Sequence, residues 1–254
     1  MAQVCWKSQK GSGHLRTILA SLTLLIGLFL ASSGRPAAAQ AADIRVLFIG
    51  NSLTSVNNLP ALVATLARSA GKRVTCEAVV FNDFSLEDHW ARGDARKAIA
   101  QGGWSVVVLQ QGPSALPESQ VLLREFTKRF DVEIRKAGAR TALYMVWPSL
   151  ARKQDFEGVS RSYTNAASDV SGLLLPVGDA WRAAWTRDAS LALYGPDNFH
   201  PSAMGTYLAA LVMVQKLFGV SPIGLPAPGI PPAAVKILQE SAAGLNVSAT
   251  PLMQ

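Results

Sequence analysis

Residues 46–55 read VLFIGNSLTS, and this stretch decides which fold the rest of the chain has to complete. Four apolar residues, Val46 to Ile49, indicate a buried strand, and the Gly-Asn-Ser that follows indicates a sharp change of backbone direction. The strand therefore ends in a hydroxyl group, that of Ser52. A serine at this place serves either as the N-cap of a helix or as a nucleophile at the end of a strand.

Downstream of this stretch, strand-like and helix-like segments alternate. Near-continuous apolar runs are typical of strands that are buried on both faces, and the longer segments between them carry apolar residues at helical spacing. Five such repeats predict a parallel sheet with helices on both faces, in one domain. The expected strands are 43–50, 73–81, 104–112, 140–147 and 173–181, and the expected helices are 59–71, 89–103, 119–139, 159–172 and 202–219.

The first 39 residues differ from the rest of the chain. Several basic residues precede an apolar stretch, residues 17–31, and small residues follow it. This three-part pattern is typical of a secretory signal peptide, with cleavage near Ala39 or Ala42. Because the apolar stretch is shorter than the ~20 residues that cross a bilayer, we expect a cleaved signal and no stable membrane anchor. The expected location is periplasmic or secreted.

The excess of basic residues is concentrated in that same segment. The chain has 24 basic and 17 acidic residues, whereas the part after residue 39 has 20 basic and 17 acidic residues, a net charge of +3. Because no basic stripe remains that would follow a phosphate backbone, nucleic acid is not an expected partner. Cys76 is the one cysteine after the signal segment, so no disulfide is expected within the mature chain.

Histidine is scarce: the chain has three, and one of them lies in the signal segment. A serine nucleophile needs a base, so the candidates are His89 and His200. His200 follows Asp197 by three residues in YGPDNFHPSAMG, close enough in a tight turn for the carboxylate to orient the imidazole. Ser52, His200 and Asp197 thus form a complete set of nucleophile, base and orienting carboxylate. No second His or Cys stands at ligand spacing from His89, so no metal site is expected.

The block GNSLT, residues 50–54, and the block DNFHPS, residues 197–202, together resemble the SGNH (GDSL-like) hydrolase superfamily. That superfamily carries its serine in a G-[DN]-S-x-[ST] block after the first strand, and its Asp and His as D-x-x-H near the C-terminus. The resemblance implies a flavodoxin-like three-layer α/β/α sandwich with a parallel sheet of about five strands. It also implies ester hydrolysis through an acyl-enzyme on Ser52, with His200 as general base, Asp197 as its partner and no cofactor.

The blocks that would form the oxyanion hole depart from the superfamily pattern. The superfamily uses the serine N–H, a glycine N–H after the second strand and an Asn side chain after the third. Here Asp83 stands where the glycine is expected, and Gln110 and Gln111 follow the third strand. The resemblance therefore implies an oxyanion hole made by Ser52, Asp83 and one of the two glutamines, and it does not choose between Gln110 and Gln111.

These observations predict a signal segment over 1–39 (cleaved as late as residue 42), a hydrolase domain over 43–220, and a Pro/Gly-rich arm with a short helix over 221–254 that packs on the domain. The expected function is an exported serine esterase that acts on O-acyl, chiefly O-acetyl, esters of a small molecule or a carbohydrate. Two alternatives stay open. One is a lipid esterase that prefers long acyl chains, and the other is a catalytically silent glycan-binding module, for which the altered oxyanion blocks argue.

Overall fold

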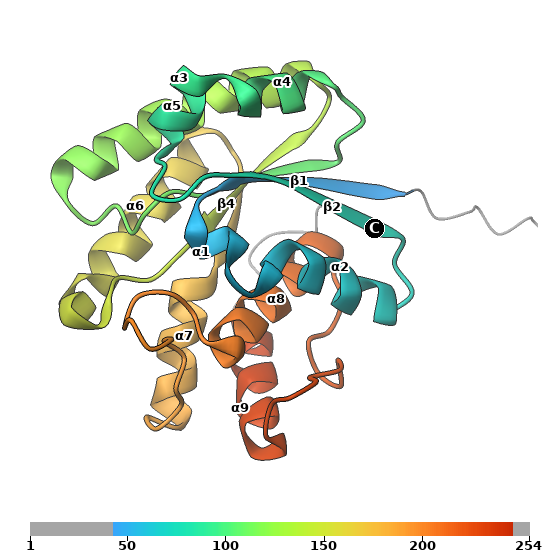
Figure 1. The fold of residues 1–254 in the computed structure, drawn as a ribbon, viewed down its shortest axis with the longest axis vertical. Helices are drawn as coiled ribbons and strands as arrows, with labels where there is room; N and C mark the ends of the chain where they lie inside the picture. Colours follow the sequence, from blue (N-terminus) through green and yellow to red (C-terminus); the bar gives the residue numbers. More distant parts are fainter. Residues whose placement is uncertain (1–42, 246–254) are drawn as a thin grey trace, which may run out of the picture. The chain divides into compact units, whose positions relative to one another are not determined.

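A five-stranded parallel sheet forms the centre of the computed structural model, which describes residues 43–245 (Figure 1). The strand order is β2-β1-β3-β4-β5, which is the order of flavodoxin-like doubly wound folds. The predicted fold class is therefore confirmed. The strands are β1 (Ile44–Gly50), β2 (Val74–Val80), β3 (Val106–Leu109), β4 (Arg140–Met145) and β5 (Leu173–Pro176).

The central strands are apolar because helices cover them on both faces. Phe48 of β1 is fully buried and lies in register with Ala78 of β2 on one side and Val108 of β3 on the other. All residues of β3 are buried as well. This burial is the reason that VLFI and VVVL read as unbroken apolar runs instead of alternating ones.

Helices form a layer on each side of the sheet (Figure 1). One layer contains α3, α4, α5 and α6, and the other contains α2, α7, α8 and α9. The first layer comprises α3 (Leu86–Arg92), α4 (Asp94–Ala100), α5 (Pro117–Lys136) and α6 (Phe156–Asp169), and the second comprises α2 (Leu59–Ser69), α7 (Val177–Arg187), α8 (Ala203–Phe218) and α9 (Pro232–Ala243). Three short helical turns, α1 (Ser52–Ser55), η1 (Val56–Asn58) and η2 (Leu150–Asp155), follow β1 and β4.

Two expected elements were wrong in their extent. The single helix expected over 89–103 is broken into α3 and α4 at Gly93, whose φ of +88° ends α3 in a left-handed cap that bonds to the His89 carbonyl. The strand expected over 173–181 ends at Pro176, and α7 begins at the next residue. In both places the boundary falls at a residue that commonly marks a helix end, Gly93 or Pro176, and apolar spacing alone did not reveal it.

The C-terminal part of the described chain lies against the second helical layer. Helix α9 packs against α7 and α8. Gln239 of α9 fastens the preceding loop, because its side chain accepts the Gly224 N–H at 2.9 Å and donates to the Leu225 carbonyl at 2.8 Å and the Tyr207 hydroxyl at 2.9 Å. The division of the chain into a domain and an arm stays a prediction.

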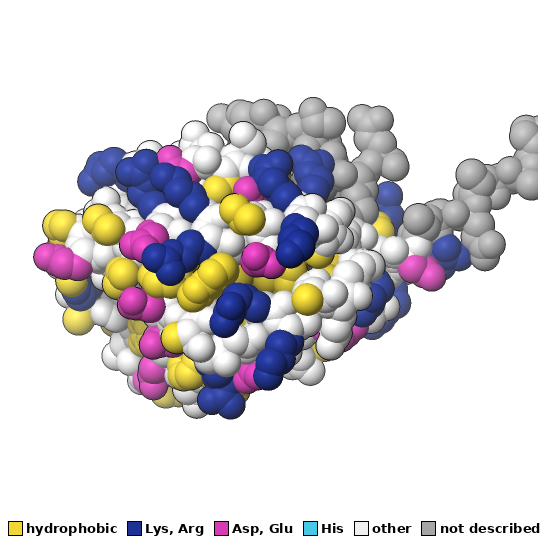
Figure 2. Space-filling model, turned by 90° about the horizontal axis from the view of Figure 1, so that it is seen from above, with side chains coloured by type: hydrophobic (Ala, Val, Ile, Leu, Met, Phe, Trp, Pro, Cys, Tyr) yellow, Lys and Arg dark blue, Asp and Glu magenta, His cyan; other side chains and the backbone are white. Residues whose placement is uncertain are grey.

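No helix among residues 43–245 combines the length and the apolar character that a membrane span requires. The predicted signal segment, residues 1–39, and its cleavage sites lie outside the described residues. Figure 2 looks onto the layer of α3, α4 and α5, where basic and acidic side chains are interspersed. Charged side chains of the layer that comprises α3, α4, α5 and α6 form exposed ion pairs, among them Arg124 with Asp169 at 2.7 Å and Arg92 with Asp94 at 2.7 Å.

Candidate active site

Ser52 is the first residue of α1 and lies two residues after the end of β1. It is therefore at the carboxyl end of the strand at which the strand order changes direction. The N-cap of α1 is Asn51, whose backbone is extended and whose side-chain oxygen accepts the Leu53 N–H at 3.1 Å. The alternative that Ser52 caps the helix is therefore wrong. Because Asn51 satisfies the helix end, the Ser52 hydroxyl is available for another partner.

That partner is His200. Ser52 Oγ lies 2.8 Å from His200 Nε2, and His200 Nδ1 lies 2.5 Å from Asp197 Oδ2. An ionised carboxylate can only accept hydrogen bonds, so Asp197 places the imidazole proton on Nδ1 and leaves Nε2 to accept the Ser52 hydroxyl proton. The structure thus brings the three side chains of the predicted triad into one hydrogen-bonded chain.

Asp197 is held in its charged form by the turn in which it lies. Its Oδ1 accepts the backbone N–H groups of Phe199 at 3.0 Å and His200 at 2.9 Å. The hydrogen bond from the His200 ring, followed by the one from the Phe199 backbone, lowers the pKa of Asp197 to about 2. Because this pKa lies below the ordinary value, the carboxylate keeps its charge and its hold on the imidazole well below neutral pH.

The loop that carries Asp197 and His200 rests on the loop after β4. The Trp147 indole N–H donates to the Phe199 carbonyl at 3.0 Å, and the Tyr194 hydroxyl donates to the Pro148 carbonyl at 2.6 Å. Trp147 is itself fully buried and stacks on Trp181, with 3.7 Å between ring centroids. His200 therefore lies on a packed aromatic support although its own side chain is partly exposed.

Asn57 joins the two halves of the site. It lies in η1, shortly after Ser52, and its side-chain amide donates to the Pro201 carbonyl at 3.0 Å and to the Thr206 hydroxyl at 2.9 Å. The segment after the nucleophile is thereby bonded to the residue that follows the base. These bonds limit changes in the distance between Ser52 and His200.

A cavity of about 310 Å³ opens beside Ser52. Its wall is drawn from the loops after β1, β2 and β3 and from the loop of the base, which is where ligands collect in open α/β sheets. The lining residues are Asn51, Ser52, Asp83, Phe84, Ser85, Gln111, Gly112, Pro113, Ser114, Ser119, Leu122 and Phe199. Within residues 43–245, no group of three or more His, Cys, Asp or Glu side chains is placed to hold a metal ion.

The chain resembles proteins of known structure. No protein-family model matches the sequence, and no curated protein sequence matches it. Among solved structures, a putative SGNH hydrolase from Slackia heliotrinireducens matches with a TM-score of 0.59 and 27% identity, covering 68% of this chain and 98% of that one. This likeness confirms the resemblance to the SGNH hydrolases that the sequence predicted. The chain is a serine ester hydrolase by class.

Two further solved structures have a fold similar to that of this chain. A DUF4886 family protein from Bacteroides uniformis matches with a TM-score of 0.66 and 20% identity, covering 80% of this chain and 94% of that one. An acetyl xylan esterase matches with a TM-score of 0.50 and 15% identity, covering 67% of this chain and 98% of that one. At these identities the likeness extends to the fold.

Gln110 does not face the cavity of this SGNH hydrolase. Its side chain is fully buried, and its Nε2 donates to Asn51 Oδ1 at 2.9 Å and to the Gln111 carbonyl at 2.6 Å. Its Oε1 accepts the Asn51 N–H at 2.9 Å and the Thr54 hydroxyl at 2.7 Å. Gln110 thus ties the nucleophile loop to β3, and its amide has no proton left for an oxyanion.

Gln111 lines the cavity, but its amide is also engaged. Its Nε2 donates to the Ser114 hydroxyl at 2.8 Å and to the Ser119 carbonyl at 3.3 Å, and its Oε1 accepts the Leu86 N–H at 3.2 Å. The structure therefore gives neither glutamine side chain the free donor that the sequence comparison led us to expect. Gly112, which the sequence analysis did not single out, lies on the cavity wall, and no described acceptor is bonded to its N–H.

Asp83 keeps the backbone shape that a glycine would have at its position. Its φ of +61° lies in the left-handed region, which Gly adopts freely and Asp tolerates. The side chain is exposed, and it lies on the cavity wall. Substitution of the expected glycine has therefore preserved the turn that presents the backbone N–H after β2.

His89, the other candidate base, lies away from Ser52 Oγ and bonds to the backbone just before Ser52. It is buried in α3, and its Nε2 donates to the Gly50 carbonyl at 2.8 Å. Burial lowers the pKa of His89, so the imidazole is neutral and matches this donor role. The aromatic rings of Phe81 and Phe84 lie against it.

Gly50 is required for steric reasons, and the variant Gly50→Ala tests this. A Cβ at Gly50 would lie 2.3 Å from Gln110 Oε1 and 2.6 Å from Thr54 Oγ1, the two atoms whose hydrogen bond supports the nucleophile loop. We expect a loss of about 1–3 kcal/mol in the free energy of unfolding, measured by denaturant titration, together with a reduced kcat. Gly112→Ala is the stability control, because a Cβ there meets no atom within 4 Å. An unchanged unfolding midpoint in Gly50→Ala would contradict the steric role.

Proposed function

We propose that this SGNH hydrolase is an exported esterase that removes O-acetyl groups from a carbohydrate, with Ser52 as nucleophile, His200 as general base and Asp197 as the carboxylate that orients it. The hydrogen-bonded chain from Ser52 Oγ through His200 to Asp197 carries the proposal. Such a chain activates a hydroxyl that is a weak nucleophile by itself.

In the proposed mechanism, Ser52 Oγ attacks the ester carbonyl while His200 Nε2 takes the hydroxyl proton. The imidazolium that forms is stabilised by Asp197. Collapse of the tetrahedral intermediate breaks the bond to the alcohol, which leaves with the proton from His200, and the acetyl group remains on Ser52. His200 then takes a proton from water, whose oxygen attacks the acetyl-enzyme. Collapse of this second tetrahedral intermediate breaks the bond to Ser52 Oγ, which takes the proton back from His200, and acetic acid is released.

The proposed oxyanion hole is built from backbone donors. Ser52, Asp83 and Gly112 all line the cavity, and no described acceptor is bonded to their N–H groups. Unpaired donors that surround a nucleophile are suited to bind a developing negative charge without rearrangement. We assign the third donor to Gly112 because the amide protons of Gln110 and Gln111 are committed elsewhere.

The dimensions and the lining of the cavity favour a short acyl group. Its volume of about 310 Å³ is at the lower end of the roughly 300–1,000 Å³ typical of ligand pockets. The apolar wall is restricted to a few side chains, chiefly Phe84, Leu122 and Phe199, and most of the other lining residues are polar. A long alkyl chain would leave those polar groups without partners, which is costly.

Export is proposed from the sequence alone. The basic, apolar and small-residue segments within residues 1–39 are the support for a periplasmic or secreted location. A carbohydrate substrate agrees with that location, since polysaccharides carrying O-acetyl groups are found outside the cytoplasm.

Acyl-chain selectivity tests the proposed function. We expect the protein to hydrolyse p-nitrophenyl acetate with a kcat/KM at least tenfold higher than that for p-nitrophenyl octanoate, because a longer chain would cover the polar side chains that line the cavity without pairing them. The measurement is release of p-nitrophenol by the purified mature protein, corrected with the Ser52→Ala variant.

Two outcomes would overturn this proposal in different ways. A higher kcat/KM for the octanoate would favour a lipid esterase. A rate for both esters equal to that of Ser52→Ala would favour the silent glycan-binding module, which the titration of acetylated glycans by calorimetry would then examine.

A further inference from the structure

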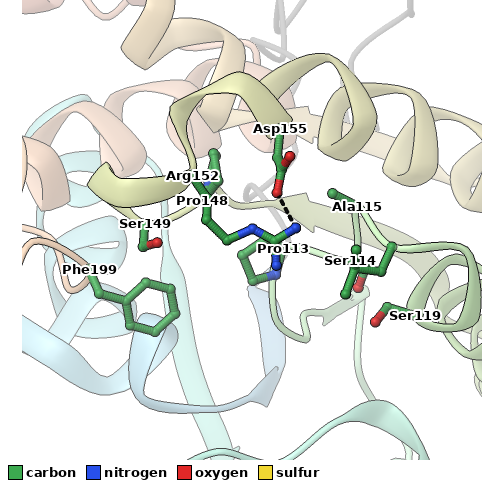
Figure 3. Close-up of a pocket in the computed structure, with 10 residues that line it drawn as sticks. Pro113, Ser114, Ala115, Ser119, Pro148, Ser149, Arg152, Asp155 and Phe199 are labelled. Carbon is green, nitrogen blue, oxygen red and sulfur yellow. Dashed lines mark ion pairs between the residues drawn. The ribbon is translucent and has the colours of Figure 1, made fainter.

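Figure 3 shows a second cavity, of about 250 Å³, whose lining overlaps with that of the cavity that contains Ser52. Four residues line both cavities, namely Pro113, Ser114, Ser119 and Phe199. Phe199 directly precedes the base, and its ring lies 5.3 Å from the His200 ring. A molecule that occupies the second cavity therefore lies next to the ester on which the triad acts.

The second cavity contains a charged pair from one short segment. Arg152 and Asp155 both belong to η2, and a guanidinium nitrogen lies 2.5 Å from Asp155 Oδ2. Figure 3 shows the Arg152 side chain extended across the cavity, between Phe199 and Ser114. This contact uses only part of the hydrogen-bonding capacity of the two groups. The remaining N–H donors of Arg152 and the remaining acceptor sites of the Asp155 carboxylate are available to a ligand.

The remaining wall alternates apolar surfaces with hydroxyl groups. Phe199, Pro113 and Pro148 contribute flat apolar surfaces. Ser119 and Ser149 contribute hydroxyls that form no hydrogen bond within residues 43–245. A sugar ring has the same mixture, with apolar C–H faces and hydroxyl groups at its rim. Each kind of surface would then meet its complement.

The charge of the pair decides between ligand classes. Arg152 and Asp155 together carry no net charge, so an uncharged polyhydroxyl ligand meets both donors and acceptors. An anionic ligand would face the Asp155 carboxylate at close range, and an alkyl chain would desolvate both charges without replacing their hydrogen bonds.

We propose that the second cavity is an alcohol subsite, which binds one uncharged sugar ring of the ester through hydrogen bonds from its hydroxyl groups to the Arg152–Asp155 pair. This assignment rests on the proposed esterase function of Ser52 and adds the residues that select its alcohol. The subsite predicts a substrate that carries its acetyl group on a neutral glycosyl unit.

The test compares two esters that share the acetyl group and differ in the alcohol. Arg152→Ala is expected to lower kcat/KM for a mono-O-acetylated methyl glucopyranoside by about tenfold to a hundredfold, because charge-assisted hydrogen bonds to the ring are lost. Hydrolysis of p-nitrophenyl acetate by the same variant is expected to stay within twofold of the wild type, since that alcohol makes no such bonds. Acetate release is measured for the first ester and p-nitrophenol release for the second.

Arg187→Ala is the matched control. Arg187 forms a comparable exposed ion pair, with Glu240 at 3.0 Å, and its side chain is 46% exposed against 47% for Arg152. It lies at the end of α7, which runs away from the carboxyl edge of the sheet, so neither ester should be affected. Asp155→Ala supplies a second variant, which should lower kcat/KM for the acetylated glucopyranoside in the same direction as Arg152→Ala.

The outcomes separate the subsite from the proposed function. If hydrolysis of p-nitrophenyl acetate by the wild type does not depend on Ser52, the esterase function fails. If that hydrolysis depends on Ser52 but Arg152→Ala lowers both esters equally, or leaves the acetylated glucopyranoside unchanged, the subsite assignment alone is overturned. A wild-type preference for the corresponding acetylated methyl glucuronoside would overturn it too, in favour of an anion site.

Discussion

Ser52→Ala is expected to lower kcat for p-nitrophenyl acetate by about three to six orders of magnitude, the range found when a member of a serine triad is removed. The hydroxyl that forms the acyl bond is lost, and His200 has no proton to take. Since Asn51 caps α1, the helix does not depend on the serine, and we expect the free energy of unfolding to change by less than ~0.5 kcal/mol. Initial rates and a urea titration on the same preparation measure both quantities.

His200→Ala is the companion variant for this prediction. It should lose nearly as much activity as Ser52→Ala, and the double variant should lose little more than either single one, because nucleophile and base act as one unit. Losses that multiply in the double variant would show that the two residues act independently. Retention of most activity in Ser52→Ala would remove the serine from the mechanism altogether.

Asp197→Asn is expected to lower kcat by about four orders of magnitude while leaving the structure intact. An amide in place of the carboxylate can still accept the backbone N–H groups of Phe199 and His200 through its oxygen. Its NH₂ group, however, would donate to His200 Nδ1 and move the imidazole proton to Nε2. That nitrogen then donates to the serine oxygen instead of accepting its proton, so general-base catalysis is lost.

Circular dichroism and thermal unfolding should show the Asp197→Asn protein to be folded, so the loss is attributable to the tautomer. Asp155→Asn provides a comparison, because it makes the same chemical change at a carboxylate outside the triad and should leave hydrolysis of p-nitrophenyl acetate near the wild-type rate. An Asp197→Asn variant that retained more than a tenth of the wild-type kcat would mean that the imidazole does not need the carboxylate to orient it.

The fold and the grouping of Ser52, His200 and Asp197 were accessible from the sequence because each depends on a local pattern. The apolar runs of β1 and β3 reflect burial on both faces. The two sequence blocks put the Ser52 hydroxyl at the end of a strand and the His200 imidazole just before a helix. The scarcity of histidine reduced the choice of base to two residues. The structure then separated them by distance, since His200 meets Ser52 and His89 meets the Gly50 carbonyl.

The oxyanion donors and the second cavity were not accessible in the same way. Whether a glutamine amide is free depends on which atoms of other loops reach it, and the sequence gives no sign that Gln110 bonds to Asn51 across 59 residues. The second cavity is lined by the loops after β3 and β4 and by Phe199, so no single segment of the sequence predicts it. Arg152 and Asp155 appear in the sequence only as an ordinary charged pair of a helical turn.

Ser52 and His200 lie 148 positions apart in the sequence, and this separation has a consequence for how the enzyme acquires activity. Contacts between such distant segments form late, because a long loop must close before the contact is gained. In the proposed mechanism the nucleophile therefore lies early in the chain and the base late, and both are needed before the ester can be hydrolysed. The Asn57 bonds to Pro201 and Thr206 join these two segments in the folded protein. During refolding, the return of ester hydrolysis therefore reports the docking of the segment that carries His200. Formation of the sheet that carries Ser52 gives no hydrolysis by itself.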